Sequence, residues 1–137
     1  IGAPFIEPRR FLCRMVDYRL PGVRFRELMF RPTFQKFKGE PCGGVQLHVT
    51  DRSVFRPLLT AVAVVKAIRE LYPTHFQWKL PPYEYEYVKL PFDILAGNSI
   101  LRREIETGAS LLDIQERWHK DEETFRQMRE PYLLYEG

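Results

Sequence analysis

The stretch that decides the fold is Val-Gln-Leu-His-Val-Thr at residues 45–50, followed by an apolar segment at residues 57–71. In the first part, apolar and polar side chains alternate strictly, which is typical of a strand that buries one face. In the second part, Pro57 suits the first position of a helix, and the residues behind it are apolar nearly all round. Lys66 belongs to the narrow polar stripe of this helix, so we expect it to face solvent. A half-exposed strand and a buried helix together predict an α/β fold.

Upstream of this stretch, the pattern predicts two further elements and a long loop. Pro8 opens a short helix at about residues 8–19, and residues 23–30 alternate in the manner of a strand. Residues 31–44 then form a structured loop, bounded by prolines and closed by paired glycines.

Downstream, short segments predominate. Turn and capping signals predict a strand at 76–80, two short helices at 94–97 and 100–107, a long helix from Ser110 to before Pro131, and a strand-like segment at 132–135. The apolar residues of the long helix are expected to face inward: Leu111, Leu112, Ile114, Trp118, Phe125 and Met128. We therefore expect a small mixed sheet covered by the helices near 57–71 and 110–129.

Composition indicates one domain, residues 1–137, around a single core. Of the 137 residues, 45% are hydrophobic and 14% are aromatic, which excludes a disordered polyelectrolyte. The most apolar run, residues 58–68, is far shorter than the roughly 18 to 20 residues that a membrane span requires. The net charge of +3 hides an asymmetry, because residues 1–50 carry nine Lys and Arg against four Asp and Glu. The basic half is the better candidate for an anionic partner.

The loop from Phe30 to Gly44 combines cations, aromatic rings and a Gly-Gly pair that lets backbone N–H groups approach a ligand. One interpretation is a saccharide or anion site, in which Phe34 or Phe37 stacks on a ring and Lys36 pairs with a negative group. The alternative is a long connection that is held by its own aromatics and carries solvated lysines.

Strand periodicity places Gln46 and His48 on one polar face, where they either line the same pocket or are bystanders. Cys42 has no activating base nearby in sequence, so we expect a buried structural thiol. The histidines and cysteines lack the close spacing of zinc sites, and we expect no metal and no cofactor. Residues 23–50 hold only Glu27 and Glu40 as acids, which makes a complete glycosidase carboxylate pair improbable there.

Basic residues alternate with phenylalanines along residues 24–38, a pattern that could bind single-stranded nucleic acid through base stacking and phosphate pairing. The net charge is modest and no nucleic-acid-binding signature is present. We therefore expect no nucleic acid partner.

Motifs along nearly the whole chain resemble the carboxy-terminal domain of the YbbC/NamZ-like family. They are Leu-Pro-Gly-Val-Arg-Phe-Arg at 20–26, Phe-x-Pro-Thr-Phe-x-Lys at 30–36, Cys-Gly-Gly-Val-Gln-x-His-Val-Thr-Asp at 42–51, Phe-Arg-Pro at 55–57, Leu-Tyr-Pro at 71–73, Phe-Asp-x-Leu-Ala-Gly at 92–97 and Pro-Tyr-Leu-Leu-Tyr at 131–135. The glycine, proline and polar positions recur in order, which makes the resemblance specific.

The resemblance implies an exo-β-N-acetylmuramidase that removes N-acetylmuramic acid from the non-reducing ends of peptidoglycan fragments. It implies a periplasmic or secreted bacterial protein, in which an amino-terminal Rossmann-like domain holds the catalytic carboxylate and the crevice between the two domains is the active site. This chain resembles the second domain only, so its partners would be that first domain and a peptidoglycan-derived saccharide. Alone, the chain is expected to be inactive.

The resemblance and the loop together give a set of candidate binding residues and no catalytic residue in this chain. The candidates for holding sugar are Thr33, Phe34, Lys36, Gln46 and His48, and the candidates for shaping the loop backbone are Gly39, Cys42, Gly43 and Gly44. The alternative function is a non-catalytic interaction module whose Phe30–Gly44 loop docks a protein partner.

Overall fold

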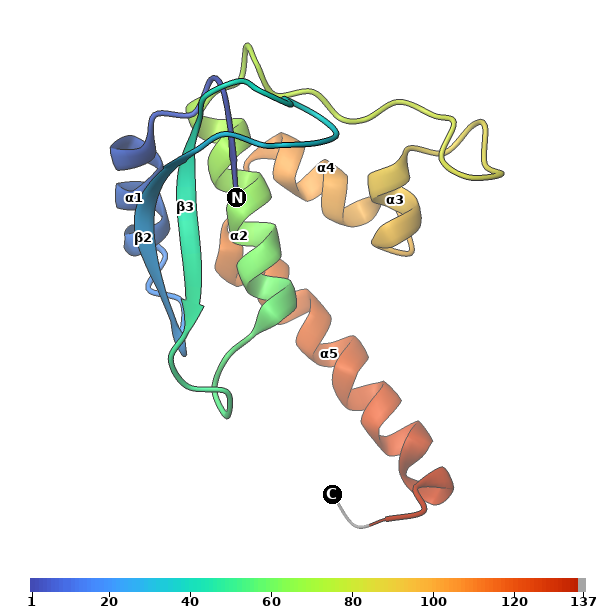
Figure 1. The fold of residues 1–137 in the computed structure, drawn as a ribbon. Coiled ribbons are helices and arrows are strands. Elements are labelled where there is room, and N and C mark those ends of the chain that lie inside the picture. The colour runs from blue at the N-terminus through green and yellow to red at the C-terminus, as the bar shows by residue number, and fades with distance from the viewer. Residues whose placement is uncertain (136–137) are drawn as a thin grey trace. The chain divides into compact units, whose positions relative to one another are not determined.

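The computed structural model describes residues 1–135, and its contacts gather into two compact units (Figure 1). The first unit is Ile1–Gln77, and the second begins at Trp78. The sequence pattern predicts one core, whereas the boundary between the units falls just after the buried helix of residues 57–71.

The first unit contains a three-stranded sheet in the order β1-β3-β2, formed by β1 (Gly2–Ala3), β2 (Val23–Phe30) and β3 (Cys42–Val49). Both strand pairs are antiparallel. The α/β class is thus confirmed, but the expected mixture of strand directions is wrong. Consecutive strands β2 and β3 are joined directly by the loop at residues 31–41, and such a return connection produces an antiparallel pair.

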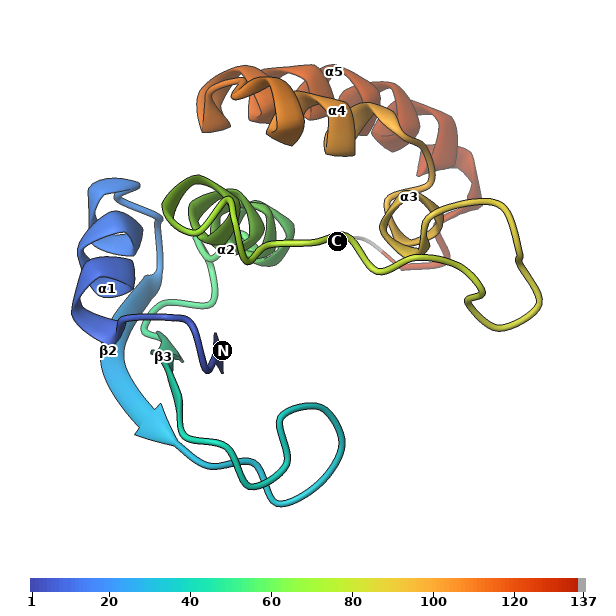
Figure 2. The same cartoon turned by 90° about the horizontal axis from the view of Figure 1, so that it is seen from above.

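Helices α1 (Pro8–Asp17) and α2 (Pro57–Leu71) belong to this unit and lie side by side (Figure 2). Helix α1 packs on β2 and β3, where Phe11 and Met15 are buried with Val23 and Val45. The helix of residues 8–19 therefore covers the sheet, a role that the sequence pattern assigned to other helices.

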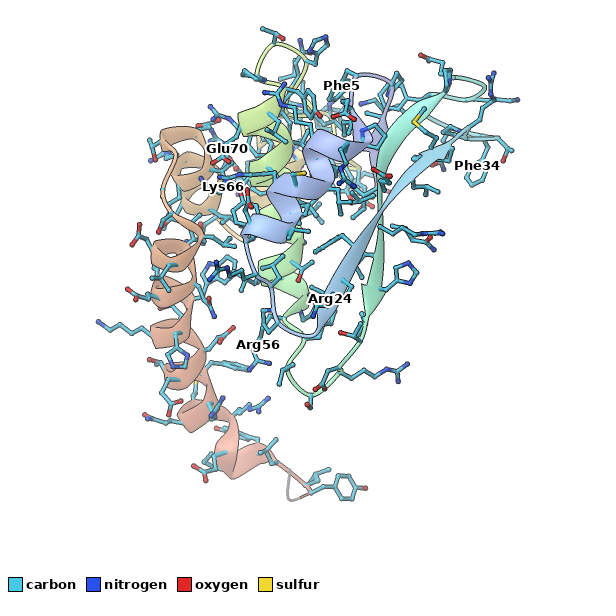
Figure 3. All side chains as sticks on the ribbon, turned by 90° about the vertical axis from the view of Figure 1, so that its left-hand side faces the viewer. Phe5, Arg24, Phe34, Arg56, Lys66 and Glu70 are labelled. Atoms are coloured by element: carbon cyan, nitrogen blue, oxygen red, sulfur yellow. The ribbon has the colours of Figure 1, made fainter. Side chains whose placement is uncertain are left out.

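Lys66 of α2 is only 4% exposed, so its expected exposure is wrong. Its Nζ lies 2.6 Å from Oε1 of Glu70, while Arg14 and Tyr18 reach Oε2 of the same carboxylate from the α1 region (Figure 3). A buried ammonium persists because a carboxylate pairs with it. Burial, followed by the nearby Glu70 charge, raises the pKa of Tyr18 to about 12. This cluster ties α1 to α2.

The second unit consists of α3 (Pro91–Leu95), α4 (Ile100–Thr107), α5 (Leu111–Arg129) and a 3-10 helix at Glu130–Tyr132. The capping of α5 is confirmed, since Ser110 and Asp113 form a reciprocal capping box. Gly108, in the left-handed region, ends α4. Arg102 joins Asp93 and Glu106 through paired hydrogen bonds, and Trp78 donates to Glu106 at 2.8 Å.

Three expectations for the second half are wrong. No strand forms at 76–80 or 132–135 within the described residues, because the prolines that flank these segments leave turns and a short 3-10 helix. Residues 83–87, in which tyrosines alternate with glutamates, form one isolated bridge, Tyr83 to Glu86. Leu112, Phe125 and Met128 are 62%, 60% and 63% exposed, whereas Ile114 of α5 is buried as expected. That the helix of residues 110–129 covers the sheet stays a prediction.

Candidate functional site

The loop between β2 and β3 is held by its own backbone. Gly39 donates its N–H to the carbonyl of Pro32 at 2.8 Å, and Arg31 donates to the carbonyl of Gly39 at 2.7 Å. Gln35 and Phe37, on either side of Lys36, both have positive φ angles, 57° and 63°. Left-handed backbone at non-glycine residues costs roughly 1–2 kcal/mol each and tends to persist at ligand-binding positions. Lys36 therefore lies in a strained turn, between two residues with left-handed backbone.

Lys36 and Phe37 line a pocket of about 480 Å³ inside the first unit. The amino-terminal segment, α2 and the residues after α2 supply the other walls: Ile1, Gly2, Ala3, Phe5, Ile6, Ile68, His75, Phe76 and Gln77. Most of these side chains are apolar. The pocket therefore brings together three regions that lie far apart in the sequence, residues 1–6, 36–37 and 68–77.

The polar groups of the pocket are cationic or neutral. Lys36 Nζ lies 4.9 Å from the centre of the Phe37 ring, and His75 and Gln77 supply the other polar side chains. None of the described lining residues is Asp or Glu. An apolar pocket that is lined by one lysine and by no Asp or Glu suits a small anion that also carries an apolar group.

The structure separates the sequence-predicted site residues. Gln46 and His48 stand on the exposed polar face of β3, opposite Arg26 and Arg24, and Arg26 donates a hydrogen bond to the Gln46 side chain. Neither residue is among those that line the pocket of Lys36, which agrees with the alternative that they are bystanders. This face of the strand turns to solvent, whereas the pocket forms around the amino-terminal segment.

Thr33 and Phe34 are exposed and also lie outside the pocket lining. Phe34 is 68% exposed and projects from the loop (Figure 3). Any contact of these two residues, or of Gln46 and His48, with a sugar stays a prediction.

The glycine pair has a structural explanation that differs from the expected one. Gly43 and Gly44 belong to β3, not to the loop, and β1 pairs directly with them. A Cβ at Gly43 would collide with the carbonyl oxygen of Ile6, and one at Gly44 with that of Ile1. The pair leaves room for the chain's own amino-terminal segment, which forms a wall of the pocket.

Cys42 is completely buried, and its thiol donates a weak hydrogen bond to the carbonyl of Glu40 at 3.7 Å. Cys13 is exposed, and both cysteines are free. The burial of Cys42 agrees with a structural thiol. Among residues 1–135, no group of three or more His, Cys, Asp or Glu side chains could hold a metal ion, and no helix is long and apolar enough to cross a membrane.

A second pocket, of about 420 Å³, lies in the second unit beside α3. Three of its polar side chains are engaged internally: Asp93 binds Arg102, Glu86 accepts from the backbone of Val88, and Asn98 accepts from that of Ile100. These groups stabilise turns and helix contacts, which leaves the Lys36 pocket as the better candidate for ligand binding.

Sequence reasoning missed Phe5, His75 and Gln77. Periodicity describes neighbours along one element, and no such signal connects residue 5 with residue 75. The one available hint was the glycine pair, because two adjacent glycines in a strand often mark close approach of another backbone.

By fold, the chain is an α/β domain of a class already seen in a solved structure. A DUF1343 family protein from Bacteroides fragilis NCTC 9343 matches with a TM-score of 0.80 and 24% identity, over 98% of this chain and 34% of that one.

By sequence, the family can be stated. A family model described as "Exo-beta-N-acetylmuramidase NamZ, C-terminal" matches residues 1–135. The chain is 40% identical over 135 residues to the peptidoglycan beta-N-acetylmuramidase NamZ of Bacillus subtilis (strain 168), which covers 98% of this chain and 31% of that protein. The chain belongs to the family of NamZ carboxy-terminal domains, and the expected resemblance is confirmed. It spans about a third of its relative's length.

Proposed function

We propose that this chain is the substrate-holding domain of a glycoside hydrolase that releases N-acetylmuramic acid from the non-reducing ends of peptidoglycan fragments. The family match along residues 1–135 and the activity named for the Bacillus subtilis relative support the reaction class. The remaining two-thirds of such a protein would supply the catalytic carboxylate and the other wall of the crevice. A peptidoglycan substrate would place the intact protein in the periplasm or outside the cell.

The observation that carries the proposal is the pocket of Lys36. N-acetylmuramic acid differs from N-acetylglucosamine by a lactyl ether, which combines a methyl group with a carboxylate. The apolar walls suit the methyl group, and Lys36 suits the carboxylate. The absence of Asp and Glu from the described lining leaves the ammonium available to a ligand.

The chain's acids support a binding role over a cleaving one. Glycoside hydrolysis uses two carboxyl groups roughly 5 to 9.5 Å apart across the scissile bond. Near the loop, Glu27 is paired with Arg9 at 3.9 Å and Glu40 is exposed, and neither lines the pocket. The isolated chain should therefore not hydrolyse muramic glycosides.

Lys36→Met in the full-length protein tests the proposal, because methionine keeps much of the apolar stem and removes the charge. A charge-assisted contact of about 1.5 to 3 kcal/mol corresponds to a roughly ten- to hundred-fold rise in KM for a chromogenic N-acetylmuramide. The lactyl methyl ester of the same substrate, which has no carboxylate charge, should be affected little. Equal losses on both substrates would show that Lys36 does not pair with the carboxylate.

One observation favours the alternative of a protein-docking module, namely the 68% exposure of Phe34. Phe34→Ser in the full-length protein separates the two functions. Under the proposed function, turnover of soluble fragments persists because Phe34 lies outside the pocket. Loss of a protein complex with unchanged turnover would favour the docking module.

A further inference from the structure

Besides Lys36, the imidazole of His75 lines the pocket, and His75 lies shortly after the end of α2. The imidazole stacks on Phe5, with ring centres 5.3 Å apart and planes 16° from parallel. Tyr72 packs edge-on against the same Phe5 ring, with ring centres 5.8 Å apart. Aromatic contacts on Phe5 therefore fix the plane of the His75 ring.

The neighbouring hydroxyl distinguishes the two ring nitrogens. Thr74 Oγ1 lies 3.0 Å from His75 Nδ1. When this hydroxyl donates to Nδ1, the proton of the neutral imidazole resides on Nε2, which then is a hydrogen-bond donor. In the part of the chain that the structure describes, Nδ1 is the ring nitrogen with a hydrogen-bond partner.

We propose that His75 is a second carboxylate-binding residue of this pocket. Its Nε2–H donates to one oxygen of the lactyl carboxylate, while Lys36 binds the other oxygen. The inference rests on the proposed function and adds a specificity residue to it. Lys36 and His75 come from different segments and line one pocket, which has no acidic side chain among its described lining residues to compete for either group. Two donors from two directions fix a carboxylate's orientation better than a single flexible lysine.

The test uses the full-length protein and two substitutions of His75. His75→Phe keeps a ring that can stack on Phe5 but removes the donor, and His75→Gln restores an N–H group. We expect His75→Phe to raise KM for the chromogenic N-acetylmuramide about tenfold, with kcat and KM for the lactyl methyl ester nearly unchanged. His75→Gln should recover most of the loss. His119→Phe, the same change at an exposed histidine of α5, should alter neither constant.

The outcomes separate this inference from the proposed function. If Lys36→Met raises KM for the N-acetylmuramide more than KM for its lactyl methyl ester, while His75→Phe does not, the inference is wrong and the proposed function stands. If neither variant affects the two substrates differently, the inference and the proposed function are both wrong. A His75→Gln variant as weak as His75→Phe, or an equal loss on acid and ester, would also overturn the assignment of a donor, because stacking alone would then explain the effect.

Discussion

The two units of the chain differ in charge and in the range of their contacts. Residues 1–77 carry 13 Lys and Arg against 6 Asp and Glu, a net of +7, whereas residues 78–137 carry 8 against 12, a net of −4. In the first unit, Arg14 binds Glu70 across 56 residues, and the Glu7 N–H reaches the Tyr72 hydroxyl across 65. In the second, most polar contacts join close neighbours, such as Arg102 and Glu106. The unit with the cationic excess and the long-range contacts is also the one that holds the Lys36 pocket.

Gly43→Val should break the first unit most severely. The new side chain would collide with the backbone of Ile6 and with Pro8, and overpacking against backbone costs about 3 kcal/mol or more. Gln46→Val, three residues along the same strand at an exposed position, is the matched control and should cost little. Urea denaturation of the isolated chain measures both. Similar stability of the two variants would show that β1 does not pack against the glycine pair.

Glu70→Gln should have the next largest effect, because it leaves the buried ammonium of Lys66 without its negatively charged partner. Breaking such a pair costs a few kcal/mol when fully buried, and the partial exposure of Glu70 reduces the expected loss to about 2 kcal/mol. Glu123→Gln in the second unit removes an exposed pair with Arg126 and should cost less than about 0.5 kcal/mol. If thermal denaturation showed equal losses of stability for Glu70→Gln and Glu123→Gln, the two units would not differ in this respect.

The same cluster predicts how stability depends on acidity. Burial alone would raise the pKa of Glu70, but hydrogen bonds from Lys66 and Arg14 outweigh burial and hold that pKa below its ordinary value. The native state then binds fewer protons than the unfolded state, so this stabilisation is present above the unfolded pKa of about 4.3 and is lost as pH falls through the lower folded value. The loss of stability below about pH 4 should be less steep in Glu70→Gln. If stability depended on pH identically in the unsubstituted chain and in Glu70→Gln, Glu70 would not contribute to the loss of stability at low pH.

Cys42→Ser should have a smaller effect than Gly43→Val and Glu70→Gln. The serine hydroxyl fits the space and can donate to the Glu40 carbonyl, so we expect a cost of about 1 kcal/mol and retention of at least a tenth of full-length activity. A complete loss of turnover with an unchanged melting temperature would instead indicate that the thiol takes part in the reaction.

The contrast between the units also explains how much the sequence could predict. Pro57 and Ser110 mark helix starts through local rules, and the structure confirms both of them. The extension of β3 through Gly43 and Gly44 was missed because glycine disfavours strands, and only the packing of the amino-terminal segment requires it there. Burial of Lys66 was missed because part of its environment comes from α1, some fifty residues away. Lys36 was found from loop composition, but its neighbours Phe5 and His75 depend on tertiary contacts.

The central claim is that the Lys36 pocket of the first unit holds the lactyl carboxylate. A crystal structure of the full-length protein with N-acetylmuramic acid tests it most directly. We expect the carboxylate to lie within hydrogen-bond distance of Lys36 Nζ, about 2.7 to 2.9 Å, with the lactyl methyl group against the apolar walls. A sugar bound with its carboxylate on other residues, and with the Lys36 pocket unoccupied, would contradict the claim.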